Sequence, residues 1–171
     1  MKKNLLLLLV AALVLYVLLS GVKIQSVEEY YQTHLEDIKE DSQTVTLSIR
    51  CDAALEQPLS DELRALLPED GEILPPTRYV LRSGDSVLDI LLRAVRHERI
   101  ALEYQGTTAL GGAYVEGIQY LYEFSCGPAS GWVYRVNGTM PNVSCSRCLP
   151  EDGDVIEWIY TCNLGQDVEG S

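Results

Sequence analysis

The segment DVIEWIYTC, near the end of the chain, most constrains the fold. Successive side chains of a strand point to opposite faces of a sheet. Both faces are apolar in this segment, with Ile156, Trp158 and Tyr160 on one and Val155 and Ile159 on the other. Strands that are apolar on both faces are typical of the centre of a sheet. The segment therefore predicts a central strand, to which the rest of the chain must add neighbours.

Two earlier segments predict further parts of this sheet. Residues 44–51, TVTLSIRC, alternate between apolar and polar side chains, as in a half-buried strand. Residues 78–100 predict a strand, a turn and then a helix, with Asp85 or Ser86 placed to cap the helix N-terminus. The intervening residues 52–77 are rich in proline and acid, so we expect a long loop with one helical turn.

The second half of the domain predicts more strands. We expect a short strand from Ile100 that runs into a glycine-rich loop, and another strand over residues 118–126. Asn137-Gly138 supplies the positive backbone angles of a tight turn. This dipeptide predicts a hairpin made of Trp132–Val136 and Thr139–Val143.

Residues 1–23 predict a membrane-spanning or signal helix. Two lysines precede an apolar run that is at the lower limit for a transmembrane helix and long for a signal-peptide core. An uncleaved anchor is the favoured interpretation and a cleaved signal is the alternative. Lysines before such a run stay in the cytoplasm, so the remainder is expected on the extracytoplasmic face, or secreted. Residues 24–43 predict an acidic helical stalk or linker, and residues 44–171 the folded domain.

The charge of the chain excludes some partners. There are 25 acidic and 13 basic residues, for a net charge of −12. Nucleic acids and anionic lipid surfaces attract positively charged proteins. We therefore expect no nucleic-acid partner. The expected membrane contact is through the N-terminal helix.

Four motifs together resemble the DUF4430 family, also called the transcobalamin-like C-terminal domain. They are GDSVLDILLRA, GAYVEGIQYLYEFSCGPASGWVYRVNG, PNVSC and EDGDVIEWIYTCNLGQD, and the resemblance covers about residues 44–168. It implies an α+β fold of the β-grasp type, in which a mixed sheet packs on one helix. In animal cobalamin carriers the related domain closes over the vitamin from one side, while a large helical domain holds the other side. No room for such a helical domain is expected in this chain.

An exported chain meets an oxidising compartment, where disulfides form. The resemblance also implies which cysteines pair. The first and last strands of a β-grasp domain are parallel neighbours, which favours a Cys51–Cys162 bridge. A Cys126–Cys145 bridge would then enclose the hairpin. Cys148 is left as a free thiol, with an intermolecular disulfide or redox or metal chemistry of the CSRC segment as alternatives. No metal site is expected, because zinc would need two more ligands.

The favoured function is a non-catalytic binding module whose surface is the hairpin. Its candidate ligand-binding residues are Trp132, Tyr134, Arg135, Asn137 and Met140. Aromatic side chains on a rigid hairpin suit a flat organic ligand or a protein partner, because little ordering entropy is lost on binding. Cobalamin or a related corrinoid is one candidate ligand, and no cofactor is expected. The alternative for Trp132 and Tyr134 is that they fill the core.

Two other functions remain as alternatives. The first is a structural or adhesion module of the cell envelope that acts through protein–protein contacts. The second is an enzyme, which the residues favour least. Nucleophilic catalysis needs a base beside serine or cysteine, whereas His34 is predicted in the stalk and His97 at the end of a helix.

Overall fold

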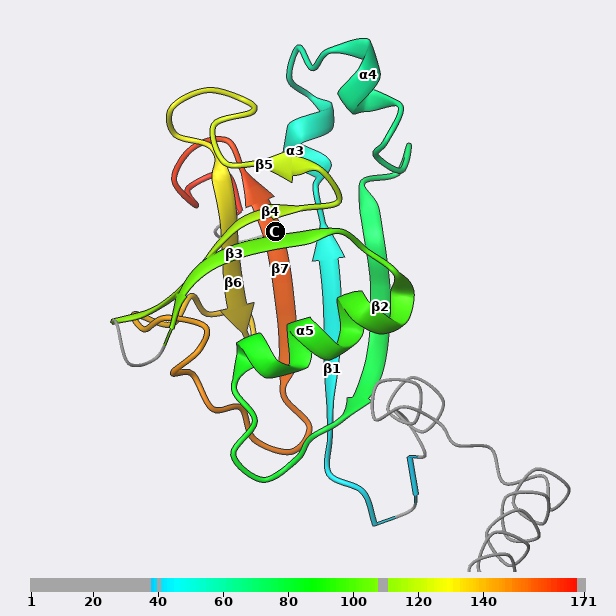
Figure 1. Cartoon of the computed structure of the whole chain (residues 1–171), viewed down its shortest axis with the longest axis vertical. Helices are drawn as coiled ribbons and strands as arrows, with labels where there is room; N and C mark the ends of the chain where they lie inside the picture. The colour runs from blue at the N-terminus through cyan, green and yellow to red at the C-terminus, as the bar shows by residue number, and fades with distance from the viewer. Residues whose placement is uncertain (1–37, 40, 108–110, 169–171) are drawn as a thin grey trace, which may run out of the picture. The chain divides into compact units, whose positions relative to one another are not determined.

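The computed structural model describes residues 38–39, 41–107 and 111–168. The predicted anchor at 1–23 and most of the predicted stalk at 24–43 lie outside the described residues. The helices within the described ranges are all too short or too polar to cross a membrane. The described part is an α+β domain that is dominated by two sheets (Figure 1).

The main sheet has four strands in the order β2-β1-β7-β6. These strands are β1 (Thr44–Arg50), β2 (Glu72–Val80), β6 (Gly131–Val136) and β7 (Val155–Thr161). As predicted, β7 is central, and it runs parallel to β1 and antiparallel to β6. The inner face of this sheet is the one that carries Leu47, Ile49, Ile156, Trp158 and Tyr160, all of which are buried.

Helix α5 (Val87–Glu98) packs on the inner face. Ser86 caps it, because its hydroxyl accepts from the Asp89 N–H while the Asp89 carboxylate accepts from the Ser86 N–H. This confirms one of the two predicted caps. The other candidate, Asp85, instead pairs with Arg93 at 2.7 Å. Two single-turn helices, α3 (Asp52–Leu55) and α4 (Asp61–Arg64), interrupt the long loop after β1.

A smaller sheet in the order β3-β4-β5 also packs on the inner face (Figure 1). Its strands are β3 (Leu102–Thr107), β4 (Gly112–Ile118) and β5 (Leu121–Tyr122). Two side chains of the main sheet donate to its backbone, namely the Trp132 indole to Leu121 and the Tyr160 hydroxyl to Tyr122. These two hydrogen bonds hold the small sheet against the main sheet.

Four sequence predictions need correction. The strand predicted over residues 118–126 is instead the end of β4, a turn, the two-residue β5 and further turns. Residues 112–117 were expected in a loop but belong to β4, which pairs with β3 along its length. Strand β2 starts at Glu72 and includes two prolines, which it tolerates because it is an edge strand. The second arm of the predicted hairpin is absent beyond one bridge, Val136↔Thr139. Pro141 follows closely, and proline has no N–H to donate to a ladder.

The cap of α5 gives a first prediction. Replacing Ser86 by alanine leaves the Asp89 N–H in the first turn of the helix without its acceptor. We expect Ser86→Ala to lower the free energy of unfolding by about 1 kcal/mol, measured by urea denaturation. Ser83→Ala, an exposed serine in the same turn, is the matched control and should change stability by less than about 0.5 kcal/mol. Equal effects of the two variants would contradict the assigned cap.

Candidate functional site

Aromatic side chains pair across β6 and β7 on the inner face of the main sheet. Trp132 lies opposite Tyr160, with ring centroids 5.3 Å apart in an edge-to-face arrangement. Tyr134 lies opposite Trp158, with centroids 5.4 Å apart. Aromatic pairs at these distances stabilise a sheet beyond the area that they bury. Because β6 is an edge strand, its aromatic side chains also border the space outside the sheet.

That space is an apolar hollow of about 250 Å³, which we call the aromatic hollow. It lies between β6, the start of β4 and the segment after the Asn137-Gly138 turn. Val143 is 51% exposed and Tyr114 is 44% exposed, so the hollow opens to solvent beside them. The side chains that matter most below are Tyr114, Trp132, Tyr134, Met140, Val143 and Trp158.

The titratable groups of the aromatic hollow are held neutral. Burial, followed by the neighbouring Cys148 thiol, raises the pKa of Tyr134, whose hydroxyl donates to the Val143 carbonyl at 2.7 Å. Burial also raises the pKa of the Cys145 thiol. A raised pKa keeps a phenol or a thiol protonated at neutral pH. The hollow therefore offers an uncharged, largely aromatic surface.

The structure divides the five predicted ligand-binding residues. Tyr134 and Met140 line the aromatic hollow. Trp132 borders it but is only 5% exposed and donates to the Leu121 carbonyl at 2.8 Å, so it is mainly a core residue. Arg135 points to the outer face of the sheet. Asn137 has a φ of 51° in the turn, where its side chain is hydrogen-bonded to Asp154 and Val155.

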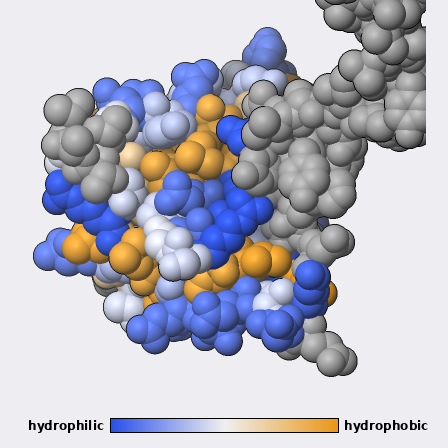
Figure 2. Space-filling model, turned by 60° about the horizontal axis from the view of Figure 1, so that its bottom comes forward, coloured by the Kyte–Doolittle hydropathy of each residue, from blue (hydrophilic) through white to orange (hydrophobic). Residues whose placement is uncertain are grey.

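Exposed apolar side chains elsewhere form no continuous surface on the face that Figure 2 shows. They lie there in several separate groups with polar side chains between them (Figure 2). Single apolar residues are normal on protein surfaces. On that face, apolar exposure alone does not indicate a binding site.

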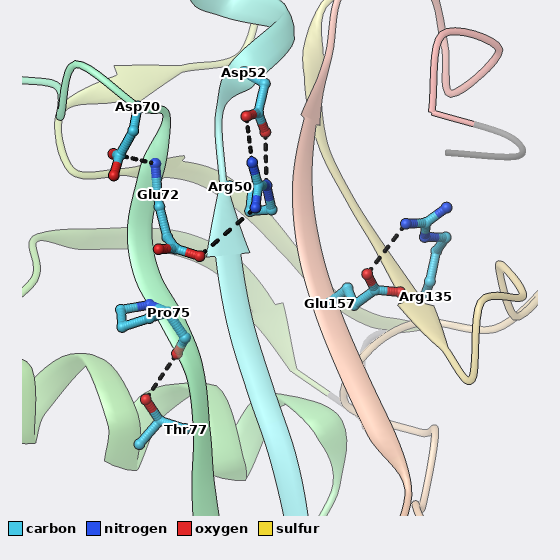
Figure 3. Close-up of polar contacts among 8 residues, drawn as sticks. All are labelled: Arg50, Asp52, Asp70, Glu72, Pro75, Thr77, Arg135 and Glu157. Atoms are coloured by element: carbon cyan, nitrogen blue, oxygen red, sulfur yellow. Dashed lines mark hydrogen bonds and ion pairs between the residues drawn. The ribbon is translucent and has the colours of Figure 1, made fainter.

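A charged cleft of about 690 Å³ lies on the outer face of the main sheet, next to α3 and the segment after β7. Its two arginines are already paired (Figure 3). Arg50 contacts Asp52 at 2.5 Å, and Arg135 contacts Glu157 at 3.2 Å and donates to the Val168 carbonyl at 2.7 Å. The hydrogen bond from Arg50 holds the pKa of Asp52 below its usual value. An anionic ligand would have to compete with these carboxylates.

The outward face of the small sheet carries tyrosines next to carboxylates. We call Glu103, Tyr114, Glu116, Tyr122 and Glu123 the tyrosine face. The Tyr122 hydroxyl donates to Glu103 at 2.7 Å and the Tyr114 hydroxyl donates to Glu123 at 2.6 Å. Sequence analysis missed this face. The alternation of AYVEG was a signal for it, but that segment was assigned to a loop.

Gly117 also belongs to the tyrosine face, because it lies beside the Tyr122 ring. A Cβ atom at Gly117 would lie 2.6 Å from the Tyr122 ring, so only glycine lets that ring lie across β4.

All five cysteines are free thiols in the structure, so the predicted pairs Cys51–Cys162 and Cys126–Cys145 stay predictions. The thiols of Cys126 and Cys162 lie near one another, and each affects the pKa of the other. Cys145 instead neighbours Cys148, the predicted free thiol, in one turn. Cys126 precedes β6 and Cys145 follows it, so a six-residue strand separates them.

Histidine and metal-ligating side chains form no cluster in the described ranges. His97 is an exposed residue at the end of α5, and its Nδ1 contacts Glu98 at 2.8 Å. His34 lies outside the described residues. Within the described part of the chain, no three histidine, cysteine or acidic side chains are grouped so as to hold a metal ion.

The core position of Trp132 gives a second prediction. Trp132→Ala would leave a cavity and would remove the donor of the Leu121 carbonyl. We expect a loss of about 3–5 kcal/mol in the free energy of unfolding, measured by chemical denaturation. Phe124→Ala, an aromatic that is 61% exposed, is the control and should be nearly neutral. A small effect of Trp132→Ala would mean that Trp132 is not part of the core.

The chain has distant similarity to proteins of known structure. No curated protein matches the chain. Among solved structures, haptocorrin in complex with Cbi is 11% identical with a TM-score of 0.46, over 74% of this chain and 27% of the haptocorrin chain. A "putative metal binding protein" from Ruminococcus gnavus ATCC 29149 is 12% identical with a TM-score of 0.41, over 70% of this chain and 96% of that chain.

The family model that matches is described as "Domain of unknown function (DUF4430)" and covers residues 84–161. These residues run from the turn before α5 to the end of β7. They include the aromatic strands β6 and β7 and the segment between them. The family that the sequence motifs predicted is therefore confirmed, and residues 84–161 carry the DUF4430 domain.

Proposed function

We propose that the domain is a non-catalytic binding module and that its ligand places an apolar or aromatic group in the aromatic hollow. The observation that carries this proposal is the hollow itself, which opens beside Val143 and has a wall of aromatic side chains from two neighbouring strands. Binding sites for small molecules are commonly concave and mostly apolar. The paired strands make the wall rigid, so little ordering entropy is lost on binding.

The size of the aromatic hollow limits what it encloses. Its volume of about 250 Å³ is below the range of roughly 300–1,000 Å³ that is usual for ligand pockets. It therefore holds one ring or one short side group, and the rest of the ligand lies across the rim. We propose a flat conjugated molecule of the corrinoid class as the ligand, with its ring system against the exposed Tyr114 and Val143.

Trp158 supports a ligand with a polar edge. Its indole nitrogen is buried and has no hydrogen-bond acceptor among the described residues. A buried donor without a partner costs free energy. Because Trp158 lines the hollow, a ligand oxygen that reaches this nitrogen would gain a hydrogen bond.

The non-catalytic assignment is supported by the chemistry of the hollow. A nucleophile requires an adjacent base or a lowered pKa. Cys145 has the opposite, because burial raises its pKa. Its Sγ lies 3.6 Å from the Ala113 carbonyl oxygen, which is no base.

Two further assignments belong to the same proposal. We assign the domain to the β-grasp type, which is supported by the parallel pairing of β1 with β7 and by α5 on the inner face of the mixed sheet. We place it on the extracytoplasmic face of the cell membrane, held by residues 1–23, with secretion after cleavage as the alternative. This placement rests on the apolar N-terminal sequence.

The binding proposal is tested by calorimetric titration of the purified full chain with cobinamide. We expect a dissociation constant in the micromolar range or tighter. Val143→Asp puts a charge at the rim of the hollow and should weaken binding at least about tenfold, since desolvating a carboxylate is costly. Val155→Asp is the matched control, because Val155 is 42% exposed and lies away from the hollow.

Either of two results would contradict the corrinoid proposal. The first is the absence of heat at high protein concentration. The second is an equal loss of affinity in the two aspartate variants, which would place the binding elsewhere.

A protein-binding role is a second candidate, and the tyrosine face favours it. Its three glutamates have no ion-pair partner among the described residues, although two accept hydrogen bonds from tyrosines. Tyrosine is enriched at protein interfaces, and carboxylates beside tyrosine attract cations. The fitting partner is a basic protein segment of the cell envelope.

A lysine-rich peptide is a suitable probe for this second role. Binding should weaken as salt is raised, because exposed charges are screened. Glu116→Gln should weaken it several-fold, whereas Glu69→Gln, which removes an exposed charge outside the tyrosine face, should not. If both variants bind the peptide with equal affinity, the overall negative charge of the chain explains the binding and the tyrosine face has no special role.

A further inference from the structure

The thiols of Cys126 and Cys162 are neighbours at one end of the main sheet. Cys126 lies in the loop that leads into β6, and Cys162 follows the last residue of β7. Each thiol affects the pKa of the other, and the Cys162 thiol donates to the Ala53 carbonyl at 3.4 Å. Both residues are half-buried, so a small molecule can reach this end of the sheet, whereas the neighbouring Cys51 is fully buried.

The backbone on both sides of this contact is already fixed. Gly131 pairs with Thr161 in the β6–β7 ladder, and the Leu164 N–H donates to the Ala129 carbonyl at 2.9 Å. The N–H of Cys126 is held by Ser130 Oγ at 3.0 Å. A disulfide forms readily only where the two backbones already lie at a short distance. Here residues three and five positions after Cys126 are bonded to residues within two positions of Cys162.

The segment after β7 is likewise anchored where it leaves the sheet. Asp167 accepts from the Cys162 N–H at 2.7 Å and also from the Thr161 hydroxyl. Farther along, the Val168 carbonyl accepts from Arg135 at 2.7 Å. This segment forms one side of the charged cleft. A covalent bond at Cys162 would fasten its first residue as well.

We propose that Cys126 and Cys162 form a disulfide by thiol–disulfide exchange, and that this bridge ties the segment after β7 to the loop before β6. The inference goes beyond the proposed function, because it requires no ligand in the aromatic hollow. It replaces the two pairs predicted from the sequence. Cys51 stays reduced, since it lies deeper in the core beside Cys126.

The exchange needs an oxidant, which is a low-molecular-weight disulfide such as glutathione disulfide. The thiolate of Cys126 attacks one sulfur of the oxidant and displaces a small thiolate. The thiolate of Cys162 then attacks the sulfur of Cys126 in the mixed disulfide and displaces the second small thiolate. The two protein sulfurs lose two electrons in total, and their protons end on the two released small thiols.

The surroundings of the pair favour the protonated thiols. The exchange should therefore become faster as the pH rises and more thiolate forms. Burial raises the pKa of Cys126, and burial with the Cys126 thiol next to it raises that of Cys162 to about 12. The titratable groups that face the pair come from every neighbouring element. They are Cys51 after β1, Glu56 after α3, Tyr160 on β7 and Asp167 in the C-terminal segment. All are neutral or acidic, so none of them favours the thiolate by its charge.

The test is a disulfide map of the full chain after incubation with glutathione disulfide. Free thiols are blocked under denaturing conditions, and the chain is digested without reduction and analysed by mass spectrometry. We expect a linked pair of peptides that contain Cys126 and Cys162, while Cys51 carries the blocking group. The rate of linkage should rise with pH, because the thiolate is the attacking species.

Two variants and a stability measurement sharpen this test. Cys162→Ser should leave Cys126 blocked, whereas Cys148→Ser, the matched control, should keep the link. The bridge closes a loop of about 36 residues, so oxidation should raise the thermal midpoint of the wild type by on the order of 10 °C, and that of Cys162→Ser hardly at all.

The proposal is overturned if the wild-type map shows Cys126 and Cys162 blocked, or linked to other cysteines. The map of the wild type is decisive even if a variant fails to fold. A link between Cys51 and Cys162 would restore the pair predicted from the sequence. None of these outcomes depends on whether a corrinoid binds.

Discussion

The parallel pairing of β1 with β7 places every other part of the domain. It joins the two ends of the described fold, from Thr46↔Val155 to Arg50↔Ile159. Parallel neighbours cannot be joined by a tight turn, so the chain between them must cross the sheet. In doing so it supplies α5 and the small sheet, both on the inner face, and then adds β6 at the free edge of β7. The carboxyl ends of β1 and β7 also bring three cysteines to one end of the sheet.

The alternation of side chains along β6 and β7 separates two chemical environments. On the inner face the ladder places Tyr134 opposite Trp158, beside the aromatic hollow. On the outer face it places Arg135 opposite Glu157, in the charged cleft. The two arginines of the charged cleft are ion-paired within the protein, whereas the inner edge leaves aromatic surface open to solvent. This asymmetry is why we assign ligand binding to the hollow.

Local patterns in the sequence predicted the elements that depend mainly on residues close together in the chain. The two apolar faces of β7, the cap of α5 and the Asn137-Gly138 turn are of this kind. The errors came from tertiary effects that no local pattern contains. Residues 139–143 do not form a second hairpin arm, because β6 pairs with the distant β7 and Pro141 lacks a donor. Contacts between remote segments also decide which of the two alternatives holds for Trp132, which is buried.

The central claim is that the aromatic hollow is the binding surface. Its most direct test is to follow backbone amide signals of the isotope-labelled full chain by nuclear magnetic resonance while cobinamide is added. The account predicts that the largest shifts cluster at Tyr134, Met140 and Val143. Shifts that cluster at Glu103, Glu116 and Tyr122 or around Arg50 and Glu157, or no shifts at all, would contradict it.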